Sequence, residues 1–172
     1  MLENARAADL GQASLGDNGA MRVSAKADYA VRAAAELAAA GAGRPLKGER
    51  IADAQQIPLK FLENILAELK HDGIVRSQRG AEGGYWLARP AEQVTLAEVI
   101  RAVDGPLANV RGVRPEAVAY GGSARHLLDV WVAVRASLRN VLERVTLADL
   151  VAGTLPLEVR DLLQAPDAWV SH

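Results

Sequence analysis

The sequence predicts a mainly α-helical fold that contains one small β-hairpin. Apolar residues recur at helical spacing over most of the chain, whereas apolar and polar residues alternate only in two short runs, 74–78 and 85–88. Residues 79–84 form a glycine-rich loop between these runs, as expected for a hairpin. The chain has 172 residues, of which 50% are hydrophobic and 24% charged, so it is large enough for one ordinary domain with an appendage.

Three helices precede the hairpin. The first is expected over Lys26–Ala40, where helix formers dominate before Gly41 and Gly43; either Tyr29, Ala33, Leu37 and Ala40 or Ala30, Ala34 and Leu37 would face inward. A short second helix covers 49–55. The third runs from Pro58, which suits a first helical turn, to His71. Leu62, Ile65, Leu66 and Leu69 follow at i, i+3, i+4 and i+7, so the third helix should bury one stripe and expose the opposite side.

Capped and heptad patterns follow the hairpin. Thr95 and Glu98 have the spacing of a capping box, and Thr146 with Asp149 suggests a second capped start. Between them, residues 105–123 predict an irregular loop and residues 124–145 a long helix. The apolar stripe of that helix is wide enough for a dimer interface, and its candidate contact residues are Leu127, Trp131, Val134, Leu138 and Val141.

Several classes of protein are disfavoured. No phosphate loop, paired metal-binding histidines or nucleophile elbow is found, so we expect no enzyme. The chain has no cysteine, which excludes disulfides and thiolate-held metal sites. No apolar run is long enough to span a bilayer and no leader pattern is seen, so we expect no membrane partner and a cytoplasmic location.

The order helix, short helix, turn, helix, hairpin is typical of a winged helix-turn-helix DNA-binding fold, to which the long dimerisation helix is added. Residues 22–89 carry 11 Lys and Arg against 8 Asp and Glu, a weakly basic balance within a chain of net charge −1. On the third helix, Lys60, Glu63 and Asn64 are candidates for contacts with base edges in double-stranded DNA. A merely solvated helix face, and for residues 74–88 a plain surface hairpin, are the alternatives.

Other candidate DNA contacts lie outside the third helix. Arg79 at the hairpin tip could enter the minor groove of A·T-rich DNA. Arg22 and Lys26 precede or begin the first helix and would contact phosphates. One module offers few contacts, so specific binding would need a homodimer on a roughly palindromic operator.

Several sequence blocks in this order resemble the Rrf-type transcriptional regulators. They are residues 21–32 (MRVSAKADYAVR), 51–52 (IA), 58–66 (PLKFLENIL), 73–80 (GIVRSQRG), 83–85 (GGY), 98–107 (EVIRAVDGPL) and 146–150 (TLADL). The resemblance covers about residues 21–155 and implies a winged-helix domain with a dimerisation helix that crosses to the partner. Positions matching the family's recognition helix are Lys60, Phe61 and Glu63. Arg79 and Gly80 match the wing, and Lys26 and Tyr29 match first-helix positions near the DNA backbone.

The chain departs from its relatives in the loop before the long helix. Many members of the family hold a [2Fe–2S] or [4Fe–4S] cluster there with three cysteines, but residues 109–126 contain none. Ser123 stands at the last cysteine position, His126 keeps a ligand-like histidine, and Asp28 matches an acidic ligand of some relatives. Without thiolates these residues cannot hold an ordinary cluster, so we expect no cofactor and structural roles for both Asp28 and His126.

The sequence therefore predicts a cluster-free dimeric DNA-binding regulator, most simply a repressor. Its signal would be a small-molecule or protein effector at the 105–125 loop, or it would act constitutively. The alternative is a winged-helix interaction module that has lost DNA binding. The expected organisation is a disordered tail over 1–20 (or a short helix near Leu2–Leu10), a winged-helix domain over 21–90, an effector-loop and dimerisation region over 91–155, and a C-terminal tail over 156–172.

Overall fold

A computed structural model describes residues 23–110 and 113–170. The N-terminal segment 1–20 and the candidate phosphate contact Arg22 lie outside these residues. The helices of the described chain are α1 (Ala25–Ala40), α2 (Gly48–Gln55), α3 (Leu59–His71), α4 (Leu96–Asp104), α5 (Leu127–Leu142), α6 (Leu147–Ala152) and α7 (Leu157–Leu163). Single 3-10 turns occur at Ala91–Gln93, Pro115–Ala117 and Gly122–Ala124.

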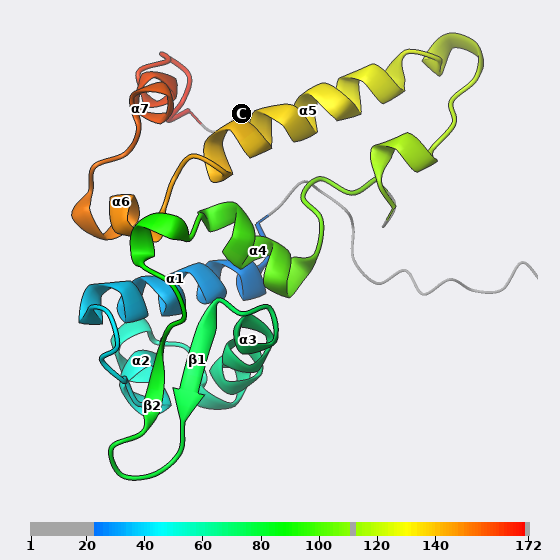
Figure 1. Ribbon diagram of the computed structural model, residues 1–172. Helices are drawn as coiled ribbons and strands as arrows, with labels where there is room; N and C mark the ends of the chain where they lie inside the picture. Colours follow the sequence, from blue (N-terminus) through cyan, green and yellow to red (C-terminus); the bar gives the residue numbers. More distant parts are fainter. Residues whose placement is uncertain (1–22, 111–112, 171–172) are drawn as a thin grey trace, which may run out of the picture.

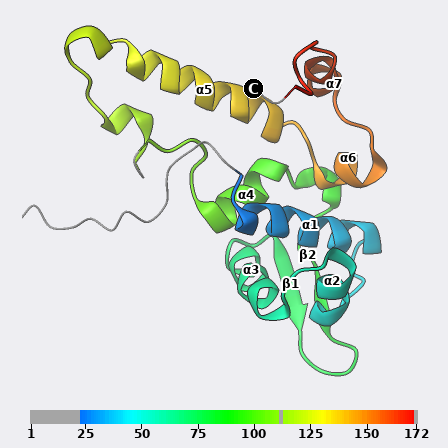
Figure 2. The ribbon, with the colours of Figure 1, turned by 180° about the vertical axis from the view of Figure 1, so that it is seen from behind.

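Helix α1 is the centre of the core. It packs against α2, α3, α4, α6 and the hairpin, and it lies across the middle of the globular body in Figures 1 and 2. Its buried face consists of Ala27, Ala30, Ala33, Ala34 and Leu37, so it contains the whole of the second expected face together with Ala33 of the first. Tyr29 and Ala40 are only partly buried. Small alanine side chains let the surrounding helices approach closely, which explains how one helix contacts so many elements.

Strands β1 (Val75–Gln78) and β2 (Gly84–Leu87) form the predicted antiparallel hairpin. Val75 pairs with Leu87 and Gln78 with Gly84. A third piece of extended chain pairs with β2 at one point, where Leu46 and Tyr85 form an isolated antiparallel bridge. The hairpin loop projects from the end of the body opposite α5 (Figure 1). Together with the three preceding helices this arrangement is a winged helix-turn-helix, as the sequence predicts.

The core continues beyond the hairpin. Val94, Val99, Val103 and Leu147 belong to the same buried cluster as α1 and α3, so α4 and α6 are part of the winged-helix body. Both predicted capping boxes are present, at Thr95 with Glu98 and at Thr146 with Asp149. The two caps lie side by side, because Leu96 N–H donates to the Val145 carbonyl and Leu147 N–H to the Val94 carbonyl, both at 2.9 Å.

Helix α5 lies outside the body: the described parts of the chain between α4 and α5, residues 105–110 and 113–126, lead outward, and α5 returns toward α6 (Figures 1 and 2). It begins three residues later than the expected 124, because Gly122–Ala124 forms a 3-10 turn first. The segment expected to be a C-terminal tail contains α7, of which Val159 alone is buried. No helix in the described part of the chain combines the length and apolarity needed to cross a membrane.

Replacing Leu147 by alanine should destabilise the whole body. Leu147 is fully buried between α6 and α1, and a buried leucine truncated to alanine leaves a cavity that costs about 2–5 kcal/mol. Leu150, in the same helix, is 37% exposed and provides the matched control. Urea denaturation should show a much lower midpoint for Leu147→Ala than for Leu150→Ala; equal midpoints would mean that α6 is not part of the core.

Candidate nucleic-acid interface

The turn between α2 and α3 fixes the angle of the helix pair. Gln56 takes a left-handed conformation (φ 53°) as the C-cap of α2, and its N–H donates to the Ala52 carbonyl. Ile57 then inserts into the core, with 3% of its surface exposed. Pro58 is the N-cap of α3 and its carbonyl accepts from the N–H groups of Phe61 and Leu62. A buried residue within a three-residue turn holds both helices, so α3 has one defined orientation.

The two faces of α3 differ as the sequence predicts. Leu62, Ile65, Leu66 and Leu69 are fully buried. Lys60, Glu63 and Asn64 are exposed near its N-terminal end, and within residues 23–110 and 113–170 their side chains make no hydrogen bond or ion pair. A DNA duplex would therefore meet side chains whose polar groups are available without breaking internal contacts. Their role in binding stays a prediction.

Tyr29 and Phe61 connect α1 to α3. Their rings meet edge to face with centroids 5.7 Å apart, and the guanidinium of Arg32 lies 5.3 Å from the Tyr29 ring centroid. Phe61 keeps 39% of its surface exposed. Aromatic pairs of this geometry add about 0.5–1.5 kcal/mol beyond their buried area. Both residues are candidate DNA contacts from the sequence, which stays a prediction; the structure shows that they pack α3 against α1.

Lys26 is engaged inside the protein. Its ammonium donates to the Val103 carbonyl at 2.8 Å and pairs with the Glu68 carboxylate at 2.7 Å. Next to it, Ser24 caps α1 and donates its hydroxyl to Asp104 at 2.5 Å. A DNA phosphate would therefore have to compete with the Val103 carbonyl and the Glu68 carboxylate for the Lys26 ammonium. In the structure Lys26 joins the start of α1 to the C-terminal ends of α3 and α4.

The wing depends on two adjacent glycines. A Cβ on Gly83 would lie 2.2 Å from the Gln78 carbonyl oxygen, and one on Gly84 would lie 2.5 Å from that of Leu46. No side chain fits at either position, so glycine is required for the tight reversal and for the Leu46–Tyr85 bridge. Arg79 and Gly80 are exposed at the tip.

One contributor to the wing was missed at the sequence level. The ammonium of Lys47, at the start of α2, donates to the Gly80 carbonyl at 2.8 Å and so ties the loop to the helix pair. Gly80 lies 33 positions further along the chain, and Lys47 belongs to no recognisable motif. Only its place in a basic stretch, residues 44–50, could have drawn attention to it.

The candidate dimer residues lie on α5. No residue of α5 is buried in the single chain. Among the candidates, Leu127, Trp131, Val134 and Val141 are partly buried, whereas Leu138 is 37% exposed. Val130 and Val132 add exposed fractions of 52% and 36%. The helix thus exposes apolar surface along its length, as a protein–protein interface requires.

The comparisons with known proteins place this fold in one class. A profile of the Rrf2 family, described as iron-dependent transcriptional regulators, matches residues 23–153. Rv1287 of Mycobacterium tuberculosis, named as an HTH-type transcriptional regulator, is 51% identical over 142 residues, 83% of this chain and 88% of that protein.

Two solved structures agree. CymR of B. subtilis, a global cysteine regulator, has a TM-score of 0.66 at 29% identity, covering 77% of this chain and 98% of its own. T. potens IscR has a TM-score of 0.63 at 32% identity, covering 77% and 87%.

The protein is therefore a DNA-binding transcriptional regulator of the winged helix-turn-helix class, and not an enzyme. More specifically, it belongs to the Rrf2 family. The family resemblance, the fold class and the regulatory function expected from the sequence are confirmed.

The iron of the family description does not fit the donors of this chain. The sequence has no cysteine, and within the described residues no group of three His, Asp or Glu could hold a metal ion. His126 Nε2 lies 3.0 Å from Arg125 Nε, and its Nδ1 lies 3.8 Å from the Asp129 carboxylate. Asp28 pairs with Arg32 at 3.1 Å. An iron–sulfur cluster needs soft sulfur ligands, so these residues would not retain one.

Proposed function

We propose that the protein binds a roughly palindromic operator as a homodimer and represses transcription from it in the cytoplasm, without an iron–sulfur cluster. The observation that carries the proposal is the polar face of α3, formed by Lys60, Glu63 and Asn64, which no other described residue engages and which lies next to an exposed wing. In helix-turn-helix proteins the N-terminal residues of the second helix contact base edges in the major groove. Arg79 would enter the neighbouring minor groove.

The exposed apolar face of α5 supports the homodimer. A two-fold dimer would place two copies of α3 on one duplex and double the number of phosphate and base contacts. The wing tip and α5 lie at opposite ends of the molecule, so pairing through α5 leaves both wings free to contact DNA (Figure 1). Repression follows most simply where such a dimer occupies a promoter. The signal that releases it would act at residues 105–125.

The proposal is tested by measuring operator affinity against salt. The operator is first identified by recovering bound fragments from the genome. Affinity measured by fluorescence anisotropy should then fall linearly on a log–log plot of salt, because each neutralised phosphate releases counterions. The alternative function is that of an interaction module without DNA affinity. In that case no DNA fragment would be recovered with the protein, and no dependence of affinity on salt would be measured.

Arg79→Ala should weaken operator binding without changing stability. The side chain is exposed and makes no hydrogen bond or ion pair within the described residues, so its removal leaves the hairpin intact. The expected reduction in affinity is about tenfold, and the salt slope should fall by about one for each phosphate that is no longer neutralised. Arg160→Ala, on exposed α7, is the matched control and should bind like the wild type. Equal affinity of the two variants would remove the wing from the proposed interface.

A further inference from the structure

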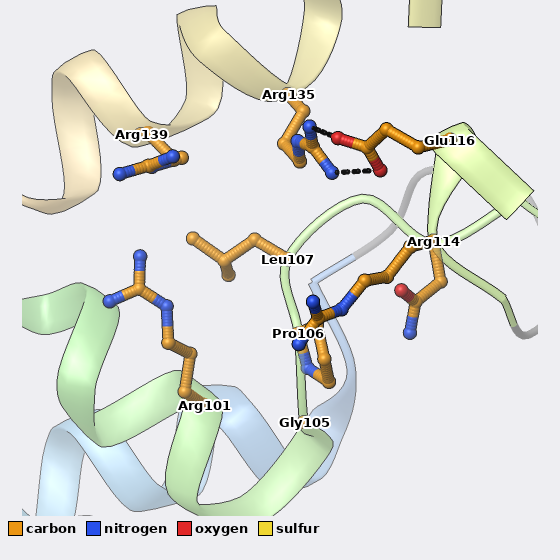
Figure 3. Close-up of a pocket in the computed structure, with 9 residues that line it drawn as sticks. Arg101, Gly105, Pro106, Leu107, Arg114, Glu116, Arg135 and Arg139 are labelled. Atoms are coloured by element: carbon orange, nitrogen blue, oxygen red, sulfur yellow. Dashed lines mark hydrogen bonds and ion pairs between the residues drawn. The ribbon is translucent and has the colours of Figure 1, made fainter. Parts of the chain in front are cut away.

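A large arginine-lined cleft lies between α4, the following loop and the middle of α5 (Figure 3). Its volume is about 710 Å³, within the range of about 300–1,000 Å³ typical of small-molecule sites. Arg101 enters it from α4, Arg114 from the loop, and Arg135 and Arg139 from α5. Gly105, with φ of 77°, lets the chain turn sharply after α4 and form the wall of the cleft.

The cleft has more positive than negative groups. Arg135 forms a two-pronged pair with Glu116, one hydrogen bond of which is 2.8 Å long. Glu143 accepts from Arg101 and, at 2.9 Å, from Arg139. Four guanidinium groups are therefore balanced by two carboxylates, and Arg114 has no ion-pair partner among the residues that the structure describes.

Both carboxylates stay ionised, so the balance holds at ordinary pH. The hydrogen bond from Arg135 lowers the pKa of Glu116 to about 2. Hydrogen bonds from Arg101 and Arg139 likewise lower the pKa of Glu143. Among the residues that the structure describes, the cleft thus keeps an excess of two positive charges, carried by Arg114 and by the two arginines that share Glu143.

We propose that this cleft binds a small organic dianion with carboxylate or phosphate oxygens, which is the effector of the regulator. Two excess charges match a dianion, and guanidinium groups bind both kinds of oxygen through paired hydrogen bonds. Arg114 would be the main contact, with Arg101 and Arg139 on the opposite wall. The cleft is lined by residues of α4, the following loop and α5. Helix α5 lies at the end of the molecule opposite the hairpin loop (Figure 1), so the arginines of the cleft do not serve the proposed wing contact with DNA. The regulatory part of this inference rests on the proposed operator binding.

The wall of the cleft is connected to the recognition helix. Arg101 and Gly105 flank Val103, whose carbonyl accepts from Lys26, and Lys26 in turn pairs with Glu68 on α3. A dianion that draws Arg101 or the end of α4 toward α5 would change these contacts. Binding energies are reciprocal, so a ligand that alters operator affinity is itself bound with altered affinity by the DNA complex.

The binding test uses the full chain without DNA. Isothermal titration with succinate and, separately, with inorganic phosphate is carried out at constant ionic strength, with chloride as the reference anion. We expect one saturable site per chain for at least one of the two anions. Binding of succinate alone identifies a dicarboxylate effector, and binding of phosphate alone identifies a phosphorylated one. If neither saturates while the same preparation binds its operator, the inference fails and the proposed function stands.

Two variants test whether the anion binds in the cleft. Arg114→Gln should weaken anion binding about tenfold or more, because it removes a charge-assisted hydrogen bond. The side chain is exposed and unpaired within the described chain, so the variant should fold normally. Arg160→Gln is the matched control and should bind like the wild type. Equal affinity of both variants would overturn the site, and a raised dimer dissociation constant in Arg114→Gln would show that a partner chain occupies the cleft instead.

The regulatory part has its own measurement. Operator affinity of the wild type should change at least severalfold when the bound anion replaces chloride at fixed ionic strength, a change typical of allosteric coupling. Arg114→Gln should lose this response while keeping operator affinity in chloride. An unchanged operator affinity at saturating anion would exclude it as the effector.

Discussion

Leu138→Glu should convert the protein into a monomer that binds its operator about a hundredfold or more weakly. Leu138 is the most exposed of the candidate dimer residues, so the glutamate is accommodated in the single chain but would be buried in the dimer. Burying an unpaired carboxylate at an interface is strongly unfavourable. Removing the second module abolishes the increase in affinity that linked sites provide, which is commonly 10²–10⁴-fold.

Sedimentation velocity and fluorescence anisotropy measure the two parts of this prediction. Asn140→Glu provides the control, since Asn140 is exposed on α5 outside the apolar stripe and the added charge is the same. Circular dichroism of both variants should match the wild type. If Leu138→Glu sediments as a dimer, the assembly uses another surface. If it is a monomer with full operator affinity, the two-module argument is wrong.

Asn64→Ala should cost about 1–3 kcal/mol in each half-site and remove the preference for one base pair. The amide of Asn64 is exposed near the start of α3 and unengaged within the described residues, which suits a two-pronged contact to adenine. Because a dimer carries two copies of Asn64, the free-energy costs at the two half-sites add. The variant should keep its stability, because no internal hydrogen bond is removed.

Competition with operators changed at single positions would show the missing preference directly. His71→Ala, exposed at the far end of α3, is the control and should leave the preference intact, since the first turns of a recognition helix contact bases. Glu63→Ala should instead raise the affinity for unrelated DNA, because its carboxylate repels phosphates. An unaltered preference in both Asn64→Ala and Glu63→Ala would refute the assignment of α3.

Local patterns in the sequence were sufficient to predict most of the fold. The stripe Leu62, Ile65, Leu66 and Leu69 specified α3 and its buried face, because a helix places these positions together whatever surrounds it. The Thr95 and Thr146 capping boxes predicted two helix starts correctly. Helix α7 was not predicted, since its single buried residue, Val159, gives no periodic signal.

The parts that could not be predicted depend on contacts between distant positions. Lys26 carries the positive charge expected of a phosphate contact. Its partners inside the protein, Glu68 and Val103, lie 42 and 77 positions further along the chain. The cleft likewise combines arginines from α4, the loop and α5, which no short motif connects. The sequence therefore indicated the exposed face of α3 more readily than the electropositive cleft.

The pairing of the two capped starts has an evolutionary consequence. The chain between Val94 and Leu147 is closed at its base, where backbone hydrogen bonds join the two capped starts, and its outer part is the loop with α5. The closure cost of such an excursion grows only slowly with its length. The loop and α5 can thus be lengthened, shortened or given new ligand groups without disturbing the winged-helix body. A lineage could exchange one sensory chemistry for another while retaining the same DNA-binding scaffold.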